Sequence, residues 1–247
     1  MNRALPILVV VVSLLGIVGG GFLAFKKLSA PPAKSVTELE VKDETTDLTL
    51  EDSPYTTLVP GPSCEYTLNI SKIKNSPASV EYEIIYKNGE GVTQGATGSI
   101  KPAGSTSASK KILFGSESSG KRRCDPDVSG GSITLRYRNN AGKVIGRASS
   151  NFSLVENGHT VSVDKLTVSF EKKATGRVLA MGTMGFPSSA PGKVSEGPYG
   201  VFTNLSSKIS PTVKISGSGD LYAWSGTSWG KVTGATANLS ALVLQAP

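Results

Sequence analysis

Residues 79–86 read SVEYEIIY, a stretch in which an apolar or aromatic side chain occupies every second position, at Val80, Tyr82, Ile84 and Tyr86. A period of two is typical of a β-strand with one buried face and one face in solvent. The chain repeats this pattern many times, and the repetition decides the fold class that the sequence predicts.

Similar runs follow at roughly ten-residue spacing, and none has a convincing helical period. Turn signals such as Asn88-Gly89 and Ala141-Gly142 separate them. Beside 79–86, we predict strands at 64–70, 91–100, 107–114, 131–139, 143–154, 159–172, 176–186, 199–205, 212–216, 220–226, 228–234 and 239–246.

A length of 247 residues allows one large domain or two small ones. Many short strands with turns between them favour antiparallel sandwiches. We therefore predict an all-β chain with two antiparallel β-sandwich (Ig-like) modules, at 55–155 and 156–247, preceded by a single N-terminal transmembrane helix.

Residues 5–25, LPILVVVVSLLGIVGGGFLAF, contain no charged side chain. At 1.5 Å per residue a helix of this length covers roughly 30 Å, the thickness of a bilayer core. Either a cleaved signal peptide or a retained anchor would have such a run. Lys26 and Lys27 follow it directly, and the one small-residue cleavage site, Leu28-Ser29-Ala30, precedes a proline. We predict a retained signal anchor over residues 1–28, in contact with membrane lipid.

The charges flanking this segment favour one orientation and the downstream chain favours the other. Lys26, Lys27 and Lys34 would place the C-terminal part in the cytoplasm by the positive-inside rule. The even cysteine count and the secreted type of β module favour the outside, and lysines can snorkel from either side. We predict a single-pass cell-membrane protein with an extracytoplasmic body.

The two cysteines, Cys64 and Cys124, have neither CxxC nor metal-ligand spacing. Outside the cytosol we expect a disulfide between them. In a cytosolic domain they would instead be two free buried thiols.

Residues 29–54 form a predicted linker, Pro-containing at first and acidic from residue 35. The acidic stretch 35–54 has a net charge of −6, whereas residues 55–247 have a net charge of +9. One interpretation is a solvated stalk. The other notes the apolar alternation in this stretch and expects it to pair as a strand with a sheet edge, on its own body or on a neighbour's, above all at 45–54.

The first module is basic and offers one candidate ligand surface. It is formed by two sequence clusters, and its residues are Lys110, Lys111, Lys121, Arg122 and Arg123. A nucleic-acid site would combine such a patch with aromatic residues or a recognition helix, so we expect no nucleic-acid partner. A solvated basic face and a surface that meets anionic glycans, lipid headgroups or the acidic linker remain open.

The end of the chain reads LYAWSGTSWGKVTG, followed by SALVLQAP. Together with PYGVFTNLSSKISPTVKIS upstream, it resembles the terminal β-sandwich module of large prokaryotic cell-surface proteins, over residues 176–247. In those modules a Tyr-x-Trp strand turns through Gly-Thr or Gly-Ser and returns on a second Trp. Ser225 stands where they usually carry an acidic residue. The resemblance implies a structural role at a cell surface.

Tyr222, Trp224 and Trp229 form the second candidate ligand surface. Tyr222 and Trp224 are expected on one strand face, with the turn bringing Trp229 back beside them. The two indole rings either fill or cap the core, or present a flat apolar platform on which a sugar ring stacks.

Chemistry-bearing motifs are scarce in this chain. His159 is the single histidine and lies in a turn, Asp125-Pro126-Asp127 is also a turn, and no GxSxG, HExxH, P-loop or GxGxxG motif occurs. We expect no catalytic residue, no cofactor and no metal ion. The sequence thus predicts a membrane-anchored structural or adhesive surface protein rather than an enzyme. The partners would be other surface proteins, further copies of the chain or anionic glycans; the alternatives are a glycan-binding or anionic-polymer-binding module and an accessory subunit of a membrane complex.

Overall fold

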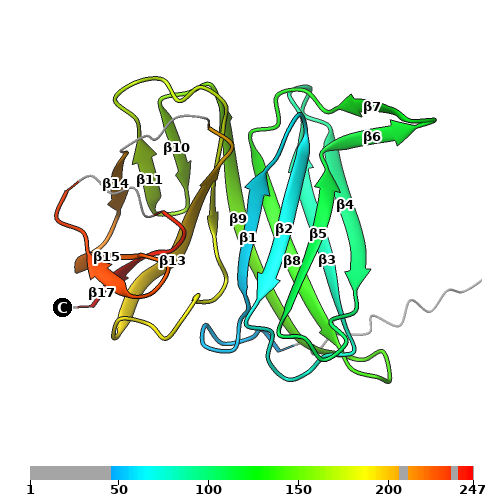
Figure 1. Ribbon diagram of the computed structural model, residues 1–247, viewed down its shortest axis with the longest axis horizontal. Helices are drawn as coiled ribbons and strands as arrows, with labels where there is room; N and C mark the ends of the chain where they lie inside the picture. The colour runs from blue at the N-terminus through cyan, green and yellow to red at the C-terminus, as the bar shows by residue number, and fades with distance from the viewer. Residues whose placement is uncertain (1–45, 206–210, 235–238, 247) are drawn as a thin grey trace, which may run out of the picture. The chain divides into compact units, whose positions relative to one another are not determined.

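The computed structural model describes residues 46–205, 211–234 and 239–246, which belong to one compact unit, Thr45–Pro247. Every regular element in these ranges is a β-strand, which confirms the predicted all-β class (Figure 1). The strands are β1 (Tyr55–Pro60), β2 (Glu65–Ser71), β3 (Ser79–Lys87), β4 (Thr93–Ile100), β5 (Ser107–Leu113), β6 (Gly115–Ser118), β7 (Lys121–Cys124), β8 (Gly130–Arg138), β9 (Val144–Glu156), β10 (Thr160–Val163), β11 (Leu166–Ser169), β12 (Arg177–Gly182), β13 (Val194–Thr203), β14 (Thr212–Ile215), β15 (Asp220–Trp224), β16 (Trp229–Lys231) and β17 (Leu242–Gln245).

The predicted membrane anchor at 5–25 and the first part of the predicted linker, 29–45, lie outside the described residues. Within the described ranges, no helix has the length and apolar character needed to cross a membrane.

The strands form one large sheet and three small ones, all paired antiparallel. The large sheet has nine strands in the order β16-β15-β17-β13-β12-β9-β8-β3-β4. The small sheets are β1-β2-β5, β10-β11-β14 and the hairpin β6-β7.

Strand β12 shows how the sheets are layered. Leu179 and Met181 belong to a hydrophobic core that also contains residues of β1, β2 and β5. Val178 and Ala180, which alternate with them, belong to a second core with residues of β10, β11 and β14. Because alternate residues of a strand point to opposite faces, the two three-stranded sheets cover opposite faces of the large sheet. β12 is therefore buried on both faces, as its apolar sequence requires.

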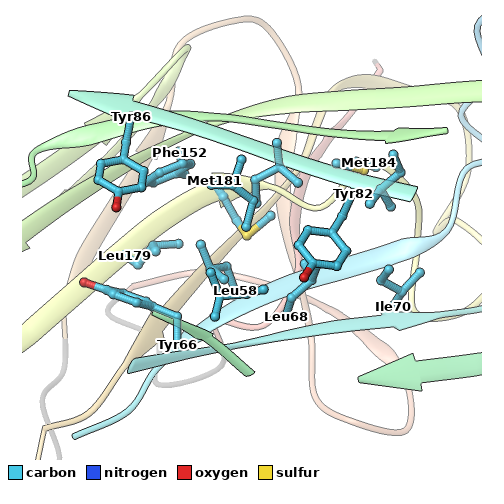
Figure 2. Packing of buried hydrophobic residues seen from close by; sticks show 14 of the residues in the cluster. Leu58, Tyr66, Leu68, Ile70, Tyr82, Tyr86, Phe152, Leu179, Met181 and Met184 are labelled. Atoms are coloured by element: carbon cyan, nitrogen blue, oxygen red, sulfur yellow. The ribbon is translucent and has the colours of Figure 1, made fainter. Parts of the chain in front are cut away.

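The first core confirms the strand alternation that the sequence suggested. Val80, Tyr82, Ile84 and Tyr86 of β3 are all buried and share this core with residues of β2 and β12. Figure 2 shows Tyr82 and Tyr86 within the cluster. Further strands place their alternate residues in the same way, among them Ile133, Leu135 and Tyr137 of β8.

The predicted module boundary at 155/156 falls at the end of β9. The large sheet continues past it, because β9 pairs with β8 on one side and with β12 on the other. The two halves of the chain thus share a sheet while each half contributes most of one core.

Two strand regions were not predicted. β1 carries two buried threonines, Thr56 and Thr57, and therefore lacks a clear apolar alternation. The β6–β7 hairpin is almost fully exposed, so no hydrophobic period marks it. A disulfide joins its last residue, Cys124, to the buried Cys64 before β2, which is the pair that the sequence offered.

The end of the predicted linker lies on the body. The Leu48 N–H donates to the Arg147 carbonyl (2.8 Å) and the Arg147 N–H to the Thr46 carbonyl (3.3 Å), which forms a parallel bridge to β9. The Arg147 guanidinium binds both carboxylate oxygens of Asp47, at 2.8 and 3.3 Å. The Leu48 side chain lies over Gly146, where a Cβ would come within 2.6 Å of it. The linker thus contacts its own body through a single bridge at Asp47, which agrees in part with the second interpretation, but residues 50–53 form a turn and bend rather than the expected strand.

Candidate functional site

The two tryptophans face each other across the β15–β16 hairpin. Trp224 is paired in register with Trp229, and their ring centroids lie 5.5 Å apart at 59°. The turn between them is closed by the Ser225 hydroxyl oxygen, which accepts the Ser228 N–H at 3.0 Å. Both indole rings are half-buried and neither belongs to a buried core. The hairpin therefore presents the rings at the surface of the large sheet.

A third ring extends this pair. Phe186, in the connection between β12 and β13, meets Trp229 edge-on, with centroids 6.3 Å apart at 83°. The Trp229 indole N–H donates to the Ser189 carbonyl at 2.7 Å, which fixes the orientation of the ring. Phe186 is half-buried as well. We call Phe186, Trp229 and Trp224 the aromatic row.

Tyr222 continues the same strand face beyond Trp224, as the sequence predicted. It lies opposite Lys231 on β16 and is half-buried. The Lys231 ammonium donates to the Asp220 carboxylate at 2.8 Å, and this hydrogen bond raises the pKa of Lys231. A charged pair therefore lies on the same hairpin as the two tryptophans.

A pocket of about 440 Å³ adjoins the aromatic row. Three segments distant in sequence form it: the turn after Leu48, the end of β2 with the residues that follow, and the β12–β13 connection. Its lining residues are Glu51, Ser53, Lys72, Lys74, Phe186, Ser188, Ser189 and Ala190. Its volume lies within the ~300–1,000 Å³ typical of small-molecule sites.

The predicted basic surface is elsewhere on the body, on β5 and the β6–β7 hairpin. The labels of Figure 1 place β6 and β7 far from β15, so the structure does not bring the two candidate surfaces together. Glu65 binds both Lys111 (3.0 Å) and Arg122 (3.4 Å), and Arg122 also binds Glu117 (2.7 Å). Hydrogen bonding from Lys111 holds the pKa of Glu65 below its usual range.

These ion pairs reduce the free positive charge of the basic surface. Lys110, Lys121 and Arg123 remain exposed, without a hydrogen-bond or ion-pair partner in the described ranges. Lys110 and Ile112 lie on the same face of β5, the face that points to the core. Ile112 is buried there, but Lys110 stays exposed because β5 is an edge strand. Charges in this position discourage a further strand from adding to an edge. A structural role therefore accounts for part of this surface.

A second hollow, of about 490 Å³, lies beside Leu50 over β8 and β9. Hydroxyl and amide side chains dominate its lining, and Asn151 donates to the Asp164 carboxylate at 2.9 Å. Its one aromatic residue, Tyr199, is 5% exposed. This hollow offers hydrogen bonds but no accessible ring.

The other chemistry-bearing residues lie apart from both hollows. His159 is exposed in the turn before β10, as predicted. Asp125 accepts the Tyr86 hydroxyl at 2.7 Å and so has a structural partner. Among the residues that the structure describes, no group of three or more His, Cys, Asp or Glu is arranged to hold a metal ion.

Comparison of the chain with protein-family models, with curated proteins and with solved structures found no match. The sequence predicted the two tryptophans and Tyr222 as a candidate ligand surface, but it predicted neither the part of Phe186 in this surface nor the pocket. Phe186 ends the run 176–186 predicted as a strand, whereas β12 ends at Gly182, and no local pattern indicates that this ring reaches a hairpin more than forty residues downstream.

Proposed function

We propose that this protein is a membrane-anchored, extracytoplasmic adhesive protein of the cell surface that binds glycans through the aromatic row. The single observation that carries the proposal is the geometry of Phe186, Trp229 and Trp224 beside a polar pocket. Pyranose rings have flat apolar faces, and half-buried aromatic rings can contact such faces while neighbouring polar groups bind the hydroxyls.

The orientation of the rings supports this role over simple core filling. Trp229 is fixed by its hydrogen bond to the Ser189 carbonyl and by contacts with a ring on each side. A ring held in place before binding loses little conformational entropy when a ligand stacks on it. Core filling alone would bury the indoles, whereas both keep accessible surface.

The proposed membrane-anchored, extracytoplasmic placement has support that is independent of the aromatic row. The uncharged run 5–25 suits a membrane anchor, and the Cys64–Cys124 disulfide suits an oxidising compartment. The resemblance of 176–247 to modules of prokaryotic cell-surface proteins agrees with both. Protease added to intact cells should therefore digest the body and leave a membrane fragment that ends near Lys34. Full protection until lysis would contradict the placement.

Tryptophan emission of the full-length protein tests glycan binding directly, because the chain has two tryptophans and both lie in the proposed site. We expect a saturable change in emission with β-1,4-linked N-acetylglucosamine or glucose oligosaccharides of two to six units. Trp224→Ala should abolish binding and Trp224→Phe should weaken it, with Trp229 as the remaining reporter. Ile145→Ala, which trims an exposed apolar residue on β9, is the matched control.

The competing candidate is an anionic polymer on the basic surface. Lys110, Lys121 and Arg123 favour it, since they have no partner in the described part of the chain. Heparin binding that disappears in 0.5 M salt and in Lys121→Ala/Arg123→Ala, with unchanged tryptophan emission, would favour this candidate and contradict a glycan site at the aromatic row.

A further inference from the structure

The pocket beside the aromatic row is continuous with it. Phe186 lines the pocket and also packs against Trp229. Ser189 lines the pocket, and its carbonyl accepts the Trp229 indole N–H. A chain molecule stacked on the rings would therefore reach the pocket with its next unit.

Two charged side chains in the pocket have no partner among the described residues. The Lys72 ammonium makes no hydrogen bond or ion pair there, and the Glu51 carboxylate makes none either. Both residues are exposed. Lys72 is held with a φ of 60°, the left-handed region that non-glycine residues seldom adopt. One donor group, the ammonium, and one acceptor group, the carboxylate, are thus available to a ligand.

Lys74 has a different role because its own charge is already matched. Its ammonium donates to the Asp52 carboxylate at 3.2 Å and to the Glu51 carbonyl. These bonds hold the turn that starts at Thr49, where Thr49 and Asp52 are also hydrogen-bonded to each other. Lys74 therefore positions Glu51 rather than attracting an anion.

The charges of the pocket indicate which ligand it suits. Lys74 and Asp52 cancel, as do Lys72 and Glu51, so the pocket has both a donor and an acceptor but no net charge. An anionic ligand would gain from Lys72 and lose against Glu51. An uncharged ligand with many hydroxyl or amide groups would use both.

We propose that this pocket is a subsite for an uncharged sugar unit next to those stacked on the aromatic row, with Lys72 and Glu51 as its specificity-determining residues. This inference rests on the proposed function and names its substrate class as a neutral glycan. It also gives the docked end of the linker a part in binding, since Glu51 and Ser53 form one wall.

The test compares chito-oligosaccharides of two to six units on the full-length protein by tryptophan emission. Binding should strengthen when the added unit reaches the pocket, and it should change little between 0.05 and 0.5 M salt. Lys72→Ala/Glu51→Ala should lose this gain, about tenfold or more in Kd, while binding the shortest oligosaccharide like the wild type. Lys87→Ala/Glu90→Ala, which removes two exposed charges from the β3–β4 hairpin, should leave the length dependence unchanged.

The outcomes separate the two proposals. If the wild type binds and Trp224→Ala does not, but Lys72→Ala/Glu51→Ala keeps the full gain with length, the subsite is refuted and the aromatic site stands. If no oligosaccharide changes the emission of the wild type, both are refuted. Binding that weakens steeply with salt would overturn the assignment of an uncharged ligand.

Discussion

Replacing Tyr137 by phenylalanine should stabilise the protein, although the side chain lies in the middle of the first core. Tyr137 is 1% exposed, and its hydroxyl has no hydrogen-bond partner in the part of the chain that the structure describes. Burial raises the pKa of this hydroxyl further above its usual value, so the group is neutral throughout the pH range of the assay. Tyr86, in the same core, is the matched comparison: it is 3% exposed, and its hydroxyl donates to Asp125 at 2.7 Å.

The two substitutions should have opposite effects on the free energy of unfolding. A hydroxyl buried without a partner costs about 1–3 kcal/mol relative to water. Removing it in Tyr137→Phe forfeits only the weak dispersion contacts of one oxygen atom, so we expect a gain of about 1 kcal/mol. Tyr86→Phe breaks a hydrogen bond to a carboxylate and should cost about 1.5–3 kcal/mol.

Urea unfolding of the full-length protein, with the disulfide intact, measures both changes. The midpoint should move to higher urea for Tyr137→Phe and to lower urea for Tyr86→Phe, with unchanged slopes. A loss of 1 kcal/mol or more in Tyr137→Phe would refute the reasoning, because it would mean that the hydroxyl has a partner.

Two further predictions concern the bonds that tie distant parts of the body together. Replacing both Cys64 and Cys124 by alanine should lower the free energy of unfolding by about 2–4 kcal/mol, because the disulfide closes a loop of 60 residues. The same urea assay measures this change, and an unchanged midpoint would contradict a stabilising disulfide. The hydrogen bond from Arg147 holds the pKa of Asp47 below its usual range, so the stabilisation from this pair is present above about pH 4 and is lost as the pH falls through the lowered pKa. Hydrogen exchange should show that the protection factor of the Leu48 amide falls on acidification. Asp47→Asn should lower this protection factor already at pH 7. A protection factor that changes neither with pH nor with the substitution would contradict this account.

Strands with one buried face were predictable because their side chains alternate. The run 79–86 became β3 (Ser79–Lys87), and the run 131–139 became β8 (Gly130–Arg138). The predicted run 159–172 holds two short strands, β10 and β11, because the chain reverses at Asp164, which has a φ of 48°. An aspartate tolerates this conformation, but nothing in the surrounding alternation marks the turn.

The site was predictable only where its residues lie close in sequence. Tyr222, Trp224 and Trp229 share a hairpin, and a two-residue period with a short turn is enough to bring them together. Glu51, Lys72 and Phe186 come from three segments, and only the layering of the sheets brings these segments together. Local patterns carry no information on such contacts.

The position of β12 has a consequence for cooperativity. Its residues alternate between the two cores, so neither half of the body can open without exposing apolar side chains that the other half needs. The two halves should therefore unfold together in a single transition, with the enthalpy from calorimetry equal to the van't Hoff value. Each half expressed alone would lack one face of its own core. What resembles two modules in sequence should in this respect behave as one folding unit.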